Sequence, residues 1–474
     1  MRFILLLALP LSAFAEPAAQ PLAELTLREA LARTLSQHPA IGLAQSDIAI
    51  AEAEALQSGL RQNPELSLSL EDLRLGDGHG QSGRSRTVGL DAQGLPIFQL
   101  QRANVEDSSS GLDGSEITLA LTQLVELGGK RVKRLEAANK ATDVARWDFE
   151  IVRANALSDT ALAFFRILGA QEVVRYHEQA LTLMEEFHRT IEESVKAGKS
   201  APLELNRIAG DVAMERVALQ RAQADLDEQR LALASLWGMA HADFGMVVGE
   251  FQQAPALAAV DAWQAKLTNN PALKRWATEL QHRDALVISE RANATPDLTL
   301  TVGLRGAVTT DERERAWGFG SDGLTWESSR LNADDDLNTS LVFEASIPIP
   351  LFNRNQGTIR AMEIRREQSG VQEVATVNAM RNEVSRWHAN ATSASKTLAI
   401  IDGGPIAEAQ EVVTLTTEGY VQGKFDYLDV LDARRNLLLL QTERIDTLTR
   451  YHEATIALQR LTGEFLDAAT TSAR

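Results

Sequence analysis

Four short segments of the chain alternate apolar and small polar residues with a period of two. This pattern is typical of strands with one apolar and one polar face. The predicted strands are 66–70, 117–122, 298–302 and 340–347. Four strands are too few to close a barrel, and an open sheet would leave unpaired edges in lipid. The pattern therefore favours a barrel shared by several copies of the chain, with half-buried strands of a soluble domain as the alternative.

Longer segments place apolar residues three and four positions apart, as coiled-coil helices do. The segment from about 131 to 196 has no proline and predicts a helix about 100 Å long. The seam positions are Leu181, Met184, His188, Ile191 and Val195 in this helix, and Leu431, Leu438, Ile445 and His452 in the last helix. We interpret the two histidines as seam residues and not as metal ligands.

Glycine and proline mark the ends and starts of the predicted helices. In one turn Gly198 ends a helix and Pro202 starts the next, and in a second turn Gly423 is followed by the N-cap candidate Asp426. Each turn predicts a helical hairpin. The segment Asp402-Gly403-Gly404-Pro405 interrupts the helix that leads into the second hairpin, and we expect that hairpin to be the more mobile one.

The two halves of the chain contain similar short segments at a nearly constant spacing. Segments 38–41, 63–66, 198–199 and 237–238 of the first half are similar, in the same order, to 270–273, 295–298, 423–424 and 462–463 of the second. The sequence therefore predicts two repeats, 16–250 and 251–474, each in the order helix-strand-strand-helix-helix. The first repeat has extra residues in the Gly/Ser/Asp-rich stretch Gly76 to Gly114, which is predicted to be a loop.

The first fifteen residues predict a secretory signal peptide. Arg2 precedes a short apolar run, and Ala13-Phe14-Ala15 forms a cleavage site. The chain contains no cysteine, so disulfides and an acylated N-terminal cysteine are excluded. Beyond the signal, no apolar run is long enough to predict a transmembrane helix.

Composition adds to this picture. In 474 residues, 24% are charged and 5% aromatic, which favours long solvated helices over a compact enzyme. The net charge of −18 argues against binding nucleic acid and is compatible with the passage of cations. No catalytic, cofactor or metal-binding motif is present, so we expect no enzyme activity, no cofactor and no metal site. Asp334-Asp335-Asp336 is interpreted as a solvated acidic run.

Three segments carry a family resemblance that covers essentially the whole chain after the signal. They are 121–131, where a predicted strand passes into a helix, 347–357, and 423–433 at the second hairpin turn. With these segments the chain resembles the TolC-type outer-membrane factors, and 347–357 resembles the heavy-metal, CzcC-like branch of resistance-nodulation-division efflux systems.

The resemblance implies a mixed α and β membrane protein of TolC-like fold. Its twelve-stranded barrel would lie in the lipid of a Gram-negative outer membrane, built by a homotrimer with four strands per protomer. The helices would form a coiled-coil tunnel in the periplasm, and the hairpin tips would dock a periplasmic adaptor, the membrane fusion protein, which works with an inner-membrane pump.

The resemblance also implies site residues. Tyr420 matches the family's gating tyrosine, Glu204 its acidic partner, and Asp429 and Asp432 the acidic rings of the periplasmic entrance. Lys424 belongs to the same entrance. The hairpin tips that contact the adaptor are marked by Gly198, Lys199, Gly423 and Phe425.

Two of these assignments need qualification from the residues themselves. Phe425 occupies the position where the family can carry a gating arginine, so we expect different contacts to close the entrance here. Asp429 and Asp432, three residues apart on one helix face, would become carboxylate rings under threefold symmetry and favour cations. The alternative is that they are acids stabilised by the start of a helix.

Two other functions remain open from the sequence. A soluble periplasmic coiled-coil adaptor would share the signal peptide, the long helices and the hairpins, but would not need four alternating strands. A TolC-like channel could also carry drugs or secreted protein, because the pump and adaptor select the cargo.

Overall fold

The computed structural model describes residues 22–72, 84–90, 96–101, 115–198, 201–309, 315–320, 323–328 and 336–464. The predicted signal peptide, Lys199, Asp334 and Asp335 lie outside these described residues.

The chain divides into two compact units, which are described separately. Unit 1 comprises Met1–Ala55, Ala137–Asp284 and Glu363–Arg474, and unit 2 comprises Leu56–Glu136 and Ala285–Met362. Each unit takes segments from both predicted repeats, and the repeat boundary at 250/251 stays a prediction.

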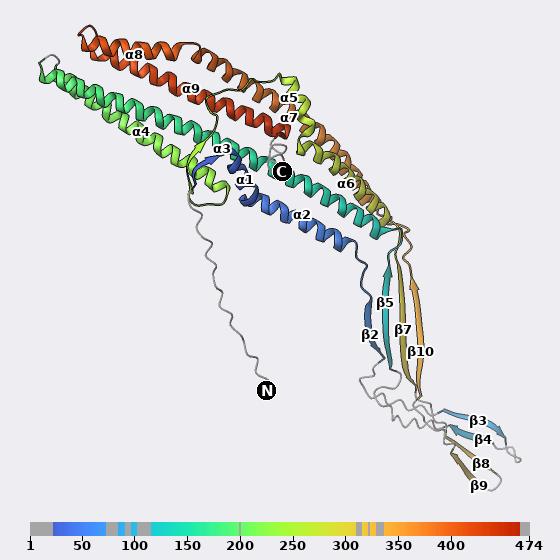
Figure 1. Ribbon diagram of the computed structural model, residues 1–474. Coiled ribbons are helices and arrows are strands. Elements are labelled where there is room, and N and C mark those ends of the chain that lie inside the picture. Colours follow the sequence, from blue (N-terminus) through green and yellow to red (C-terminus); the bar gives the residue numbers. More distant parts are fainter. Residues whose placement is uncertain are drawn as a thin grey trace, which may run out of the picture. The chain divides into compact units, whose positions relative to one another are not determined.

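Helices dominate the described residues (Figure 1). They are α1 (Leu27–Gln37), α2 (Pro39–Ser58), α3 (Lys130–Lys196), α4 (Pro202–Leu236), α5 (Val260–Lys266), the 3-10 helix η1 (Leu267–Asn269), α6 (Pro271–Asn293), α7 (Gln356–Asp402), α8 (Pro405–Val421) and α9 (Tyr427–Thr462). At 67 residues, α3 confirms the predicted long helix and is about 100 Å in length.

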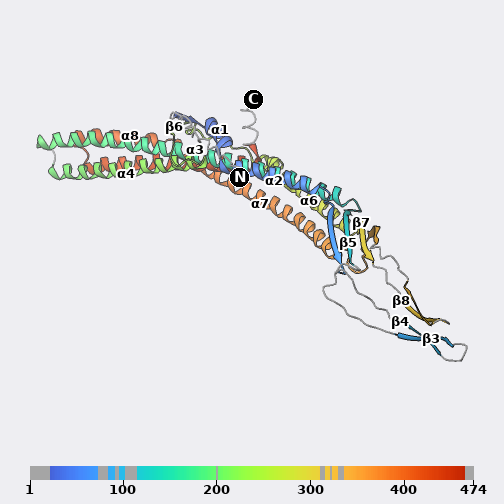
Figure 2. The same cartoon turned by 90° about the horizontal axis from the view of Figure 1, so that it is seen from below.

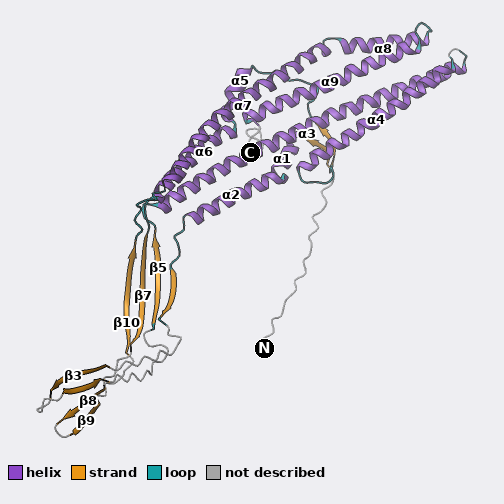
Figure 3. Cartoon of the chain, turned by 180° about the vertical axis from the view of Figure 1, so that it is seen from behind, coloured by secondary structure: helices purple, strands orange, loops and turns teal. Residues whose placement is uncertain are grey.

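The described residues also form strands, which Figure 3 shows in orange. They are β1 (Leu22–Thr26), β2 (Glu65–Glu71), β3 (Arg84–Leu90), β4 (Pro96–Gln101), β5 (Glu116–Val125), β6 (Phe244–Val248), β7 (Leu298–Thr309), β8 (Arg315–Gly320), β9 (Gly323–Ser328) and β10 (Asp336–Ser346). Strands β2, β5, β7 and β10 confirm the four strands predicted from alternation.

These four strands form the antiparallel sheet of unit 2, in the order β10-β7-β5-β2. Their register lines up apolar side chains in rows across the sheet. The two central rows are Leu68, Leu119, Leu304 and Leu341, and Leu66, Leu121, Val302 and Phe343. These eight side chains are 44–71% exposed. One face of the sheet is therefore continuously apolar and uncovered in the single chain.

The opposite face of the sheet is polar. Thr122 and Thr301 are hydrogen-bonded through their hydroxyls at 3.1 Å, and Arg305 forms an ion pair of 3.2 Å with Glu116. The two faces therefore differ in the way that the period of two predicted.

The connections out of the sheet are held by ion pairs within unit 2. Lys130, at the start of α3, is buried and lies 2.7 Å from Asp297, which also accepts a hydrogen bond from the backbone of Leu127. Glu126 pairs with Arg134 at 2.6 Å. Gly128 has φ +68°, and a side chain there would collide with Thr295. The segment that leaves β5 is therefore fixed against the one that enters β7.

The prediction of a loop from Gly76 to Gly114 is wrong for its described parts, because β3 and β4 pair there as an antiparallel hairpin. In the same way β8 pairs with β9, with Trp317 opposite Trp326. Pairing gives hydrogen-bond partners to backbone groups that a loop would leave to water. Strands β1 and β6, which the sequence analysis did not predict, form a parallel pair.

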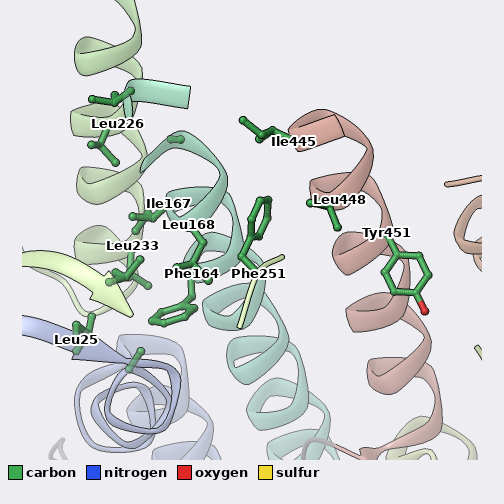
Figure 4. Close-up of a cluster of buried hydrophobic side chains, with 14 of the residues drawn as sticks. Leu25, Phe164, Ile167, Leu168, Leu226, Leu233, Phe251, Ile445, Leu448 and Tyr451 are labelled. Atoms are coloured by element: carbon green, nitrogen blue, oxygen red, sulfur yellow. The ribbon is translucent and has the colours of Figure 1, made fainter. Parts of the chain in front are cut away.

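The main core of unit 1 is built where α3, α4, α7 and α9 meet the β1-β6 pair. It includes Phe164 and Ile167 of α3, Leu233 of α4, and Leu448 and Tyr451 of α9, all almost fully buried (Figure 4). Helices α3 and α9 contribute apolar side chains to the same buried clusters, which agrees with the coiled-coil positions predicted on each.

Two helical hairpins complete unit 1, α3 with α4 and α8 with α9. Their free ends, near Gly198 and Gly423, lie at the same end of the unit (Figures 1 and 2). The predicted helix break is confirmed, because α7 ends at Asp402 and α8 begins at Pro405. Gly404 between them has φ +146°, which favours glycine. Among the described residues, no helix is long and apolar enough to cross a membrane.

Candidate entrance site at the hairpin tips

The free ends of the hairpins are shaped by local sequence. Gly198 and Gly423 adopt φ values of +71° and +73°, and Pro202 occupies the first turn of α4. After the second turn, Asp426 caps α9 and forms a capping box with Asp429. The predicted helix ends and N-cap are confirmed.

Tyr420 and Glu204, both predicted for the entrance, are brought together by the fold. The hydroxyl of Tyr420, on α8, donates to Oε2 of Glu204, on α4, at 2.6 Å. Both side chains are half-buried. This bond ties the second hairpin to the first, across 216 positions of sequence.

A second tie, which the sequence analysis did not identify, lies between Tyr427 and Asp211. The hydroxyl of the buried Tyr427, on α9, donates to Oδ2 of Asp211, on α4, and Arg435 lies 3.5 Å from the other oxygen of that carboxylate. Burial, with the hydrogen bond to Asp211, raises the pKa of Tyr427 well above its usual value. The tyrosine therefore stays protonated as a donor.

An aromatic side chain of α3 lies against both tyrosines of these hydrogen bonds. The buried ring of Phe187 lies 5.1 Å from that of Tyr420, edge to face, and 6.1 Å from that of Tyr427, stacked. The guanidinium of Arg434 lies 4.9 Å from the centre of the same ring. We call Glu204, Asp211, Phe187, Tyr420 and Tyr427 the tip cluster. It connects α3, α4, α8 and α9.

The remaining predicted residues lie on the surface of the tips. Gly198, Gly423, Lys424, Phe425, Asp429 and Asp432 are all exposed in the single chain. Asp429 accepts a hydrogen bond of 3.0 Å from the backbone of Asp426, which is the helix-start role left open above. The structure does not bring Asp429 or Asp432 into the tip cluster.

Phe425 lies against the backbone of Gly419 on α8. A side chain at Gly419 would overlap the phenylalanine ring. The backbone amides of Lys424 and Phe425 also donate to the carbonyl of Gly419. Phe425 therefore packs against its own hairpin. The arginine that the family can carry at this position would instead need a hydrogen-bond acceptor.

Part of the tip cluster has a signal in the sequence. Glu204 and Asp211 are seven residues apart on α4, which places both carboxylates on one face of that helix. Tyr420 and Tyr427 belong to different helices, on either side of the turn, so this spacing does not show that they meet the two carboxylates.

Within the described residues, no cluster of histidine, aspartate and glutamate side chains could hold a metal ion. His452 is buried, stacks on Phe165 at 4.4 Å, and bonds through Nε2 to the carbonyl of Phe251. Burial lowers the pKa of this histidine. His452 is a packed residue of the seam.

A sheet with one exposed apolar face thus lies in the same chain as two helical hairpins that are joined at their tips. The chain belongs to the family of outer membrane efflux proteins, which matches residues 30–239 and 262–464. This is a family of passive channels and not of enzymes.

Similar proteins agree with this assignment. The cobalt-zinc-cadmium resistance protein CzcC of Cupriavidus metallidurans is 27% identical over 79% of this chain and 82% of its own length. The probable outer membrane lipoprotein SilC of Salmonella typhimurium is 25% identical over 79% of each chain. A crystal structure of CusC superposes with a TM-score of 0.66 at 19% identity, over 95% of each chain. The chain thus has the fold of outer-membrane efflux channels.

Proposed function

We propose that this chain is the outer-membrane channel of a tripartite efflux pump that exports heavy-metal cations. The cargo is supported by the relatives, because CzcC is a cobalt-zinc-cadmium resistance protein and the 24% identical CusC of Escherichia coli is a cation efflux system protein. The channel is a conduit, and its pump and adaptor select the cation. The alternative of a soluble adaptor finds no support in the family match.

The observation that carries the proposal is the apolar face of the sheet in unit 2. Its two central rows are exposed in the single chain, and its edge strands β2 and β10 each pair on one side only within the described residues. Unpaired backbone groups are not tolerated in lipid, so three copies would join edge to edge in a twelve-stranded barrel. The apolar face would meet lipid and the polar face the water-filled interior.

The helices of unit 1 would then form the periplasmic tunnel, and the hairpin tips its entrance and adaptor contact. The bonds from Tyr420 to Glu204 and from Tyr427 to Asp211 hold the two hairpins of one chain together. We propose that these bonds favour the closed entrance. Asp429 and Asp432, exposed on one helix, would face the axis of the trimer and attract cations.

The cargo is tested by deleting the gene and restoring it on a plasmid. The deletion strain should become sensitive to at least one of zinc, cobalt, cadmium and copper, with unchanged sensitivity to hydrophobic antibiotics. Sensitivity to antibiotics alone would contradict the metal assignment while leaving the channel intact.

The barrel is tested by two neighbouring substitutions on opposite faces of β5. Leu121→Lys places a charge on the apolar face and should abolish the heat-modifiable trimer in outer-membrane fractions. Thr122→Lys is the matched control on the polar face and should preserve it. Equal trimer yields from both variants would refute a lipid-facing Leu121.

A further inference from the structure

A cavity of about 640 Å³ lies between the two hairpins of unit 1, beside the tip cluster. All four helices α3, α4, α8 and α9 contribute to it. Cavities of roughly 300–1,000 Å³ are the usual size for sites that bind small organic molecules. The cavity is therefore large enough for a ligand and not merely for a few waters.

Apolar side chains form much of the cavity wall. They include Leu183 and Met184 of α3, Met214 of α4, and Leu431 and Leu438 of α9. Leu183 is 50% and Met214 66% exposed in the single chain. An apolar body that covers them would remove this surface from water, which is favourable.

One charged group in the wall has buried donors without an acceptor. Arg434 lines the cavity, and its Nε and Nη1 atoms are buried without a hydrogen-bond partner among the described residues. Its guanidinium has the ring of Phe187 on one side. Burial lowers the pKa of Arg434, because desolvation penalises the charged form. Buried N–H donors of this kind require an acceptor.

Two carboxylates of the wall are already engaged elsewhere. Asp211 accepts from Tyr427 and pairs with Arg435. Glu215 is buried and lies 2.7 Å from Nδ1 of His177. Neither accepts a hydrogen bond from Nε or Nη1 of Arg434, and both would repel a multiply charged anion. Glu186 acts on Arg434 through its charge, but Nε and Nη1 still have no acceptor, and a ligand with a single negative charge and an acceptor oxygen would supply one.

We propose that this cavity binds a small amphipathic monocarboxylate, with its carboxylate at Arg434 and its apolar body against Met184, Met214 and Leu438. Such a ligand contacts both hairpins at once. Binding is a property of this cavity in addition to cation export, and it can be measured without any transport assay.

The probe is 2-naphthoate, titrated against the full chain in a detergent-free amphipathic polymer and followed by its fluorescence. Saturable binding is expected. Arg434→Gln should weaken it about tenfold or more, the loss expected for a hydrogen bond to a charged group. Arg216→Gln, on α4 but outside the cavity wall, is the matched control and should leave the affinity unchanged.

The neutral analogue 2-naphthalenemethanol separates charge recognition from apolar contact. It should bind the unsubstituted protein more weakly than naphthoate does, and Arg434→Gln should not affect it. Ala218→Phe narrows the cavity from another lining position and leaves Arg434 in the sequence, so it should abolish binding of both compounds, which keeps the test informative if Arg434→Gln does not fold.

Three results would overturn the proposal: no saturable binding of naphthoate, equal affinities for the acid and the alcohol, or an affinity for the acid that Arg434→Gln does not change. Failure of metal export in the deletion strain would leave all of these measurements unaffected, so the two proposals fail separately.

Discussion

Tyr427 donates to Asp211 one heptad away from the bond between Tyr420 and Glu204, so the two hairpins are joined by two tyrosine-carboxylate bonds on one side of α4. We predict that Tyr427→Phe raises the open probability of the channel in planar bilayers about tenfold, and that Tyr420→Phe does the same. The double variant should open more than either.

Tyr451→Phe is the matched control for this experiment. It also removes a tyrosine hydroxyl, one that donates to the carbonyl of Pro255 in the core of unit 1. Its conductance should equal that of the unsubstituted channel. A Tyr427→Phe channel with unaltered gating would remove Tyr427 from the entrance mechanism.

The second turn depends on the absence of a side chain at Gly419. Gly419→Ala would push the ring of Phe425 out of its place and should lower the thermal stability of the tips. Gly210→Ala, in α4 with open space around it, should instead stabilise the protein by about 0.5–1 kcal/mol. Thermal unfolding of the two variants checks the difference in sign.

The ion pair of Lys130 and Asp297 fixes the base of α3 in unit 2. Asp297→Ala should destabilise the protein by about 3–5 kcal/mol, because it leaves a buried ammonium without its partner. Asp284→Ala removes an exposed ion pair with Arg366 and should cost less than about 1 kcal/mol. Chemical denaturation measures both, and similar losses would mean that burial of Lys130 has no effect.

Acid should destabilise unit 1. Burial lowers the pKa of both His452 and His282 in the folded chain. The unfolded chain therefore takes up protons first as the pH falls below about 6.5, the ordinary value for histidine. Stability is complete above that pH and decreases below it.

His452→Gln should reduce this loss of stability between pH 7 and 5, and His241→Gln, at an exposed histidine, should not. Melting temperatures across that range provide the measurement. An unchanged slope for His452→Gln would show that His452 does not contribute to the acid sensitivity.

The break at Gly403 and Gly404 predicts unequal mobility of the hairpins. Amides of α8 near Pro405 should exchange with solvent faster than those of α3 near His177, where the helix is continuous. Hydrogen exchange followed by mass spectrometry compares the two segments. Equal protection of the amides in the two segments would contradict the greater mobility predicted for the second hairpin.

The sequence predicted the parts of the fold that depend on periodicity. Strand β5 and helix α3 follow directly from alternation and from a proline-free seam. The β3-β4 hairpin was missed because its surroundings are rich in glycine, serine and aspartate, and the backbone pairing of short strands leaves little trace in such a composition.

The site was predicted only where the family resemblance reached. Tyr420 and Glu204 were named together and do bond, whereas Tyr427 and Asp211 were not named. Their contact joins residues 216 positions apart, and a single sequence contains no direct sign of which polar side chains meet across that distance. Asp429 was given a place in the entrance, but its local role as a capping partner depends on the conformation of Asp426.

The sheet of unit 2 has a consequence for how the protein is made. In the single chain the sheet has two strand edges that are unpaired within the described residues, and its two central rows alone expose eight apolar side chains, so an unassembled chain is open to aggregation. If copies of the sheet join in a barrel as proposed above, folding of the sheet, entry into lipid and association of the copies would occur together. We expect the yield of functional channel to depend on periplasmic chaperones that shield these strands before assembly.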